Sequence, residues 1–179
     1  MRDRLQIAGR LSDRRMARTP DTAVVPLPQT GGCLCGAVRY ALNGGPLLAY
    51  ACHCHDCQTR SGAAFTLTLV IRSADLAVAG QPIIHERTSA SARVTERSLC
   101  PACQVQLLSR APAAPDYMSL RAGTLDDASC VVPGAQSFVE SAIPWAVIPG
   151  VPVVPWGQFD FAALGAEWLA TAPRFERPR

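Results

Sequence analysis

The stretch Ala51-Cys52-His53-Cys54-His55-Asp56-Cys57 places three cysteines within six residues, in the spacing C-x-C-x₂-C. Thiolates that lie this close together repel one another unless a soft cation neutralises them, and zinc is the usual cation. All three side chains can turn inward on one tight loop. The stretch therefore predicts a metal site.

Two further pairs of cysteines lie on either side of this triplet. Cys33 and Cys35 form a C-x-C upstream, and Cys100 and Cys103 form a C-x₂-C downstream. The seven thiols thus divide into a set of four and a set of three. Four thiolates complete a tetrahedral zinc shell, whereas three leave one position for water or substrate. We therefore expect one closed site and one open site.

Eight cysteines in 179 residues also raise the question of disulfides. Disulfide-rich proteins are secreted, and residues 1–20 contain no apolar signal segment. Cysteines one or two positions apart suit a metal knuckle better than separate disulfides. Zinc is the preferred interpretation, with structural or redox disulfides and free thiols as alternatives, and the expected localisation is cytoplasmic.

The composition favours one all-β domain. The chain has 15 prolines and 13 glycines, which favour many short strands over long helices. Strands are predicted at residues 37–42, 47–51, 64–71, 76–79, 83–87, 93–99, 105–110 and 117–122. Residues 58–62 can form one helical turn that ends in glycine, and residues 159–170 show helical spacing of apolar side chains. No apolar run reaches the ~20 residues that a membrane helix needs.

Three segments are expected along the chain. Residues 1–29 are predicted to be a disordered leader rich in arginine and proline, with a start at Met16, an organellar transit peptide or a nucleic-acid-binding tail as alternatives. Residues 30–158 would form the zinc-binding domain, and residues 159–179 a C-terminal helix and tail.

The charge of the chain argues against nucleic-acid binding by the folded part. All 17 basic residues are arginines, which is typical of a GC-rich bacterial genome. Residues 1–18 contain six arginines and two aspartates, and the rest contains eleven arginines and twelve acids. The predicted domain is therefore nearly neutral and lacks the basic stripe of a nucleic-acid-binding protein.

Four motifs follow one another along the chain. They are Gly32–Tyr40 (GCLCGAVRY), Cys52–Cys57 (CHCHDC) with Ser61-Gly62, Cys100–Cys103 (CPAC), and Gly123–Asp127 (GTLDD). In this order they resemble the family of glutathione-dependent formaldehyde-activating enzymes, also called S-(hydroxymethyl)glutathione synthases, which includes centromere protein V. The similar part covers roughly residues 30–150.

The resemblance implies a single-domain β-tent fold of short antiparallel strands that binds two zinc ions per chain. By the family's pattern the ligands of a structural zinc would be Cys33, Cys35, Cys100 and Cys103. The ligands of a catalytic zinc with an open position would be Cys52, Cys54 and Cys57. The count of thiols alone leads to the same division.

The activity that the resemblance implies is that of a carbon–sulfur lyase. In the synthetic direction the thiol of glutathione condenses with formaldehyde or a similar small aldehyde. A three-thiolate zinc could bind the incoming thiol as a thiolate, or it could polarise the aldehyde oxygen. The expected partners are these small molecules, without nucleic acid or membrane. The alternative is a non-catalytic zinc-binding β-domain that serves as a protein-interaction module, for which the three-cysteine set has no evident use.

The sequence departs from the family pattern beside the downstream knuckle. Gln104 and Val105 stand where the family usually has Gly-Thr, and Leu99 replaces a common aromatic residue. A glycine would permit a left-handed turn, so Gln104 must adopt that turn with strain or use a different geometry. The family's frequent histidine near Gln136-Ser137 is also absent.

Some single residues are assigned roles near the triplet. His53 is expected to pack behind the knuckle or to orient a ligand, with direct metal binding as the lesser alternative. His55 is a candidate proton shuttle with Asp56, or else an exposed helix start. The candidates for holding substrate carboxylates are Arg39, Arg60 and Arg72.

Other conspicuous residues are expected to be structural. His85 is predicted to lie on the surface, and Cys130 to be a small buried residue. Asp126 and Asp127 are interpreted as turn formers rather than catalytic acids. The tryptophans expected in the core are Trp145 and Trp156, with pocket lining as the alternative.

Overall fold

The computed structural model describes residues 24–88, 94–155 and 161–178, and these form a mostly β-sheet structure with two short helices. The all-β prediction is confirmed. The strands are β1 Val24–Pro26, β2 Gln29–Gly32, β3 Arg39–Leu42, β4 Leu48–Cys52, β5 Thr66–Arg72, β6 Leu76–Ala79, β7 Ile83–Thr88, β8 Val94–Leu99, β9 Gln106–Arg110, β10 Tyr117–Arg121, β11 Ala135–Ser137 and β12 Arg174–Glu176. The helices are α1 His55–Ser61 and α2 Phe161–Thr171.

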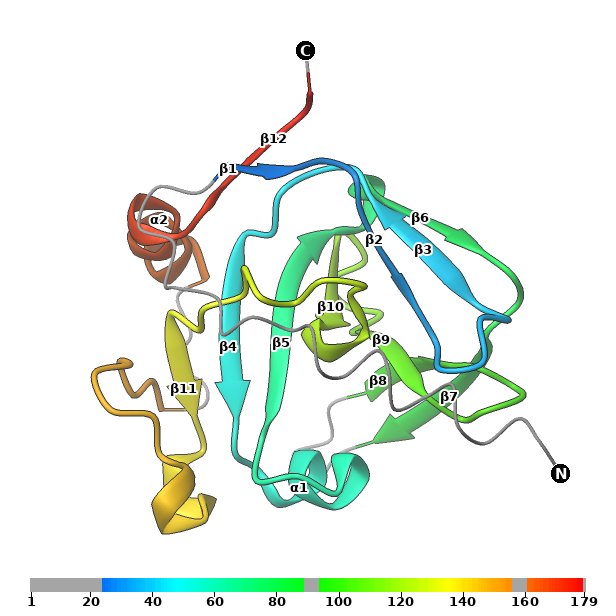
Figure 1. Ribbon diagram of the computed structural model, residues 1–179. Helices are drawn as coiled ribbons and strands as arrows, with labels where there is room; N and C mark the ends of the chain where they lie inside the picture. Colours follow the sequence, from blue (N-terminus) through cyan, green and yellow to red (C-terminus); the bar gives the residue numbers. More distant parts are fainter. Residues whose placement is uncertain (1–23, 89–93, 156–160, 179) are drawn as a thin grey trace, which may run out of the picture.

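The described strands form open sheets and no closed barrel. The largest sheet has seven strands in the order β11-β4-β5-β10-β9-β8-β7, a second has the order β2-β3-β6, and β1 pairs with β12 (Figure 1). Most neighbouring strands are antiparallel, as predicted. Two short pairs, β11 with β4 and β1 with β12, are parallel, because each joins segments that are far apart in the sequence.

The hydrophobic core joins the sheets and the C-terminal helix. It includes Tyr40 and Leu42 of β3, Ile71 of β5 and Leu120 of β10, all of them 3% exposed or less. Trp168 of α2 belongs to the same cluster, and its Nε1 donates a hydrogen bond of 2.8 Å to the Val132 carbonyl. The helix therefore forms part of the main core and is not a separate tail.

The structure corrects the expected limits of the N-terminal leader. Residues 24–29 form β1 and the beginning of β2, so they are not disordered. The strand β1 is held by β12, with Val24 opposite Arg174 and Pro26 opposite Glu176. Such a pairing between the two ends cannot be read from local patterns. Residues 1–23, the rest of the predicted leader, lie outside the described residues.

Both predicted helical segments are helical in the structure. The turn expected at residues 58–62 is part of the longer helix α1, and Gly62 ends it in the left-handed conformation, with φ of 62°. The C-terminal helix α2 begins at Phe161 and ends at Thr171, close to the predicted 159–170. Among the described residues, no helix is long and apolar enough to span a membrane.

Candidate metal centres

The first thiol group joins two loops that are far apart in the sequence. Cys33 and Cys35 follow β2, and Cys100 and Cys103 follow β8. The Sγ atoms of Cys33 and Cys35 are 3.6 Å apart, and those of Cys35 and Cys100 are also 3.6 Å apart. All four Sγ atoms lie within 4.8 Å of one another. We call this set the four-thiol group.

The backbone of the upstream loop is shaped around its sulfur atoms. The Cys33 N–H donates to the Val38 carbonyl at 2.9 Å, and the Val38 N–H donates back to the Cys33 sulfur at 3.3 Å. Gly36, at φ 82°, supplies the left-handed residue that the tight turn between them requires. In the downstream loop, hydrogen bonds from the Val105 and Cys35 backbone lower the pKa of Cys103 to about 6.

Gln104 adopts the strained backbone that its position predicts. Its φ is 60°, in the left-handed region that favours glycine. Its backbone N–H donates to the Cys100 carbonyl at 3.0 Å, and its side-chain Nε2 donates to the Pro101 carbonyl at 2.9 Å. The chain therefore keeps the turn of the downstream knuckle without a glycine.

The second thiol group lies at the junction of β4 and α1. Cys52 is the last residue of β4, Cys54 precedes the helix and Cys57 lies in its first turn. The Sγ atoms of Cys52 and Cys54 are 3.5 Å apart, and all three Sγ atoms lie within 4.8 Å of one another. Cys52 and Cys57 are buried, whereas Cys54 is half-buried. We call this set the three-thiol group.

Hydrogen bonds inside the three-thiol group distribute its protons unequally. The thiols of Cys52 and Cys54 donate toward Cys57, which lowers the pKa of Cys57. The same contacts with Cys54 and Cys57 raise the pKa of Cys52. These opposite shifts are expected of thiols that converge on one point.

Both thiol groups fit a soft metal ion such as zinc. All cysteines are free thiols, and each group gathers its sulfur atoms at distances suitable for one shared ion. Four thiols can complete a tetrahedral shell, and three cannot. The division into a closed and an open set that the sequence predicts is therefore the spatial division in the structure.

His53 lies behind the three-thiol group and is not one of its donors. Its side chain is fully buried and packs against Phe65, with ring centroids 5.2 Å apart. Burial lowers the pKa of His53, and neither ring nitrogen forms a hydrogen bond of ordinary geometry in the described part of the chain, although Gln136 and the Ala64 backbone lie nearby. The location agrees with the packing role expected of His53.

Of the two alternatives for His55, the structure shows the exposed helix start, and no described contact pairs it with Asp56. The Asp56 carboxylate instead accepts two contacts from Arg87 of β7, at 2.5 and 2.7 Å. This ion pair ties α1 to the far end of the seven-stranded sheet, so Asp56 is engaged structurally.

The three arginines expected to hold substrate carboxylates all have other contacts. Arg39 forms an ion pair with Asp126, and Arg72 lies 3.8 Å from Asp75. Arg60 donates to the Gln106 side chain at 2.9 Å and to the backbone carbonyl of its own helix. None of the three is positioned by the structure as a free anion-binding group.

The Gly-Thr-Leu-Asp-Asp block has a structural role, as interpreted. Asp126 pairs with Arg39 and accepts a 2.6 Å hydrogen bond from the Thr30 hydroxyl, while Asp127 accepts one from the Ser129 backbone at 2.9 Å.

The same block packs closely against Gly31 of β2. A Cβ on Gly31 would lie 2.2 Å from the Tyr40 hydroxyl and 2.4 Å from the Thr124 carbonyl oxygen, so this position needs glycine.

Two expectations about buried residues are wrong. Trp145 is 78% exposed, because the prolines around it hold a short surface turn, Pro144–Ala146. Cys130 is half-buried rather than buried, in a loop after Asp127. His85 is exposed, as predicted, and Trp156 lies outside the described residues.

Two arginines that no sequence motif marks, Arg97 of β8 and Arg121 of β10, lie on the sheet face that includes Cys52. The positive charge of Arg121 contributes to lowering the pKa of Cys57. The like charges of Arg60, Arg87 and Arg121 contribute to lowering the pKa of Arg97. Both occupy alternate positions of predicted strands. Only the pairing of those strands shows that they share a face with the cysteines.

Comparisons with known proteins agree with the sequence motifs. A family model described as glutathione-dependent formaldehyde-activating enzyme matches residues 28–141. No curated protein matches the chain. Among solved structures, a crystal structure of a Rhodobacter sphaeroides protein is 21% identical and covers 58% of this chain and 91% of its own, with a TM-score of 0.44. That similarity is too low to support any argument.

Proposed function

Because this chain belongs to the family of glutathione-dependent formaldehyde-activating enzymes, we propose that it joins a small thiol, glutathione in the first place, to formaldehyde or a similar small aldehyde. One observation supports the proposal above all others. The three-thiol group is separate from the four-thiol group and has one fewer donor than a closed tetrahedral site needs. A purely structural domain would need only the closed set.

The proposal assigns one zinc ion to each thiol group. Cys33, Cys35, Cys100 and Cys103 would hold a structural ion, and Cys52, Cys54 and Cys57 a catalytic one. When bound to the three-thiol group, zinc would act as a Lewis acid that lowers the pKa of a thiol or polarises a carbonyl oxygen. The family's β-tent architecture, in one domain, is part of the proposal.

The residues around the three-thiol group would shield and orient the reacting molecules. Cys52 and Cys57 are buried, so water is excluded on that side, and the half-buried Cys54 marks the side from which a substrate approaches. Gln58 fixes the loop by donating to the His53 carbonyl at 2.6 Å and to the Ser141 carbonyl at 2.8 Å. The cysteines are thereby held before any ligand arrives.

The reaction needs no oxidant and no further reactant. The sulfur of the thiol forms a bond to the aldehyde carbon, the carbonyl double bond becomes a single bond, and the thiol proton ends on the former carbonyl oxygen. The reverse direction breaks the same carbon–sulfur bond. The proposed enzyme is accordingly a carbon–sulfur lyase.

The test is the exchange of formaldehyde with glutathione, measured by NMR with a blank that contains no protein. We expect the native chain to accelerate exchange, the Cys54→Ser variant to fall to the level of the blank, and Cys130→Ser to retain the native rate. Cys130 is the matched control, because it is a half-buried cysteine outside both thiol groups.

A native chain that is no faster than Cys54→Ser would remove the formaldehyde assignment. If both proteins then bind zinc and remain folded, the non-catalytic interaction module becomes the better interpretation.

A further inference from the structure

The face of the seven-stranded sheet that includes Cys52 presents a row of polar residues from β4 to β8, beside the buried Leu48, Val70 and Leu107 of the same face. Residues directly opposite one another in paired strands lie on one face, as do alternate residues of one strand. Cys52 lies opposite Thr66, and Tyr50 opposite Thr68, which lies opposite Arg121. Ser119 lies opposite Ser109, which lies opposite Arg97. We call this set, from β4 to β8, the polar face.

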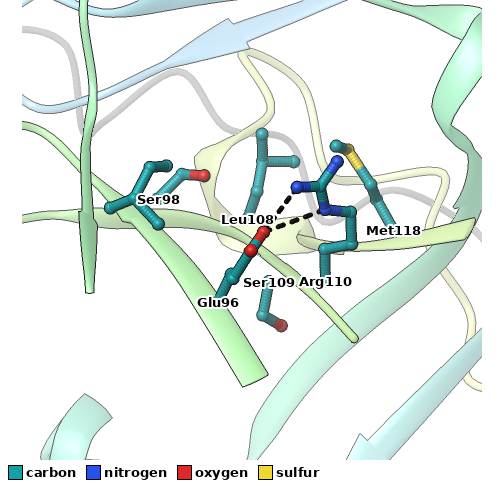
Figure 2. A pocket seen from close by; sticks show the side chains of 7 residues that line it. Glu96, Ser98, Leu108, Ser109, Arg110 and Met118 are labelled. Carbon is teal, nitrogen blue, oxygen red and sulfur yellow. Dashed lines mark hydrogen bonds and ion pairs between the residues drawn. The ribbon is translucent and has the colours of Figure 1, made fainter. Parts of the chain in front are cut away.

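On the opposite face of the same sheet an arginine is already paired with an acid. There Leu108 and Leu120 pack into the core. Toward β7 this face forms a pocket of about 290 Å³ in which Glu96 and Arg110 point toward one another (Figure 2). The Arg110 Nε and Glu96 Oε2 atoms are 3.0 Å apart, so the charge of this arginine is neutralised.

Four arginines lie around α1, and two of them are held by partners within the described ranges. Arg87 is paired with Asp56, and Arg60 donates to Gln106 and to a backbone carbonyl. Within the described ranges, Arg97 and Arg121 form no salt bridge. The Nε of Arg97 is buried and has no hydrogen-bond partner there.

The arginines therefore create a positive potential around Arg97. The pKa of Arg97 is lowered by burial first, and then by the like charges of Arg60, Arg87 and Arg121, while Asp56 acts in the opposite direction. Like charges held together at a partly buried surface are unfavourable, and an anion bound between them removes that penalty.

We propose that Arg97 and Arg121 bind a carboxylate of the thiol substrate, so that the protein selects anionic thiols, such as glutathione, over neutral ones. Guanidinium groups bind carboxylates through two parallel hydrogen bonds, and both side chains extend from the face on which Cys52 lies. This inference rests on the proposed function, because it takes the three-thiol group as the place where the substrate sulfur binds.

Arg97 is the better position for a test, because Arg121 also acts electrostatically on Cys57. The variant is Arg97→Gln. The control is Arg110→Gln, the arginine of the neighbouring strand β9, which lies on the opposite face and is paired with Glu96. Circular dichroism checks that each variant is folded, and Arg97→Lys is a second variant that retains the charge.

Thiol binding can be measured without turnover. Each protein is loaded with Co²⁺, and the thiolate-to-cobalt absorption is titrated with glutathione and, separately, with neutral 2-mercaptoethanol. We expect Arg97→Gln to weaken glutathione binding about tenfold or more while the affinity for 2-mercaptoethanol stays unchanged. Arg110→Gln should bind both thiols as the native protein does, and Arg97→Lys should restore part of the glutathione affinity. Added salt should reduce the native preference.

Two results would overturn the inference: an equal loss of affinity for both thiols in Arg97→Gln, or no loss for either. The proposed function is judged separately, by the exchange experiment. A protein that binds glutathione through Arg97 and does not accelerate formaldehyde addition retains the anion site and loses the assigned reaction. A protein that accelerates formaldehyde addition but shows no preference for anionic thiols retains the assigned reaction and loses the anion site.

Discussion

The two thiol groups use the same ligand chemistry in opposite ways. The four-thiol group brings together loops 65 residues apart, since Cys35 and Cys100 are in contact, and Cys100 is fully buried. The three-thiol group takes all its donors from one strand–helix junction, and its middle cysteine is half-buried. From this difference we infer that cysteines gathered across the chain would stabilise the fold when they share a metal ion, whereas a local set could remain open for chemistry.

The largest expected effect tests the structural half of this comparison. We expect Cys100→Ser to unfold the zinc-loaded protein or to lower its free energy of unfolding by several kcal/mol, because a structural zinc site contributes on the order of 10 kcal/mol. Thermal unfolding followed by circular dichroism measures it. Native-like stability of Cys100→Ser would show that the core suffices without the four-thiol group.

The matching change in the other group should have a smaller effect on stability. We expect Cys54→Ser to bind one metal ion fewer per chain. Its free energy of unfolding should fall by about 2 kcal/mol or less, because α1 stays anchored by the Arg87–Asp56 pair and by Gln58. Metal analysis and chemical denaturation give both quantities. If Cys54→Ser destabilises the protein as much as Cys100→Ser does, the division of roles is wrong.

A pH experiment examines the sheet that supports the four-thiol group. Tyr40 of β3 is 3% exposed, and its burial raises the pKa of its hydroxyl to about 12 from the ordinary 10.0. Between these values the unfolded chain releases a proton that the folded protein retains. The contribution of Tyr40 to the free energy of unfolding should therefore fall by about 2 kcal/mol as the pH rises from 10 to 12.

The Tyr40→Phe variant is the control for this experiment. It loses the 2.9 Å hydrogen bond to Thr124, so it should be less stable at neutral pH. Its loss of stability above pH 10 should be smaller than that of the native protein. Parallel curves for the two proteins would contradict the assignment to Tyr40.

The smallest expected effect concerns the strained turn of the downstream knuckle. We expect Gln104→Gly to be more stable than Gln104→Ala by about 1 kcal/mol, because glycine adopts a φ of 60° without steric cost. Both variants lose the hydrogen bond to Pro101, so their difference isolates the backbone. Denaturant unfolding measures the difference in free energy of unfolding between the two variants. Equal values would mean that the turn changes its backbone conformation to accommodate alanine.

Local patterns were sufficient for the elements that local physics controls. The alternation of side chains locates the strands β3 to β10 within about two residues. The knuckle pattern leaves two alternatives for Gln104, a strained left-handed turn or a different geometry, and the structure has the left-handed turn. Patterns failed where contacts are distant. The strand β1 was assigned to a disordered leader because its partner, β12, lies near the other end of the chain.

The sequence by itself determined the thiol chemistry of this protein. Cysteines one or two residues apart converge because the chain cannot separate them, so the triplet Cys52, Cys54 and Cys57 was recognisable as a site before any fold was known. Only the tertiary structure decided what surrounds that site. Arg97 and Arg121 share a sheet face with Cys52 through paired strands. Trp168 packs into one core with Tyr40 and Leu42, which are more than 100 residues away in the sequence. Strand pairing and packing join such residues although their spacing in the sequence shows no pattern.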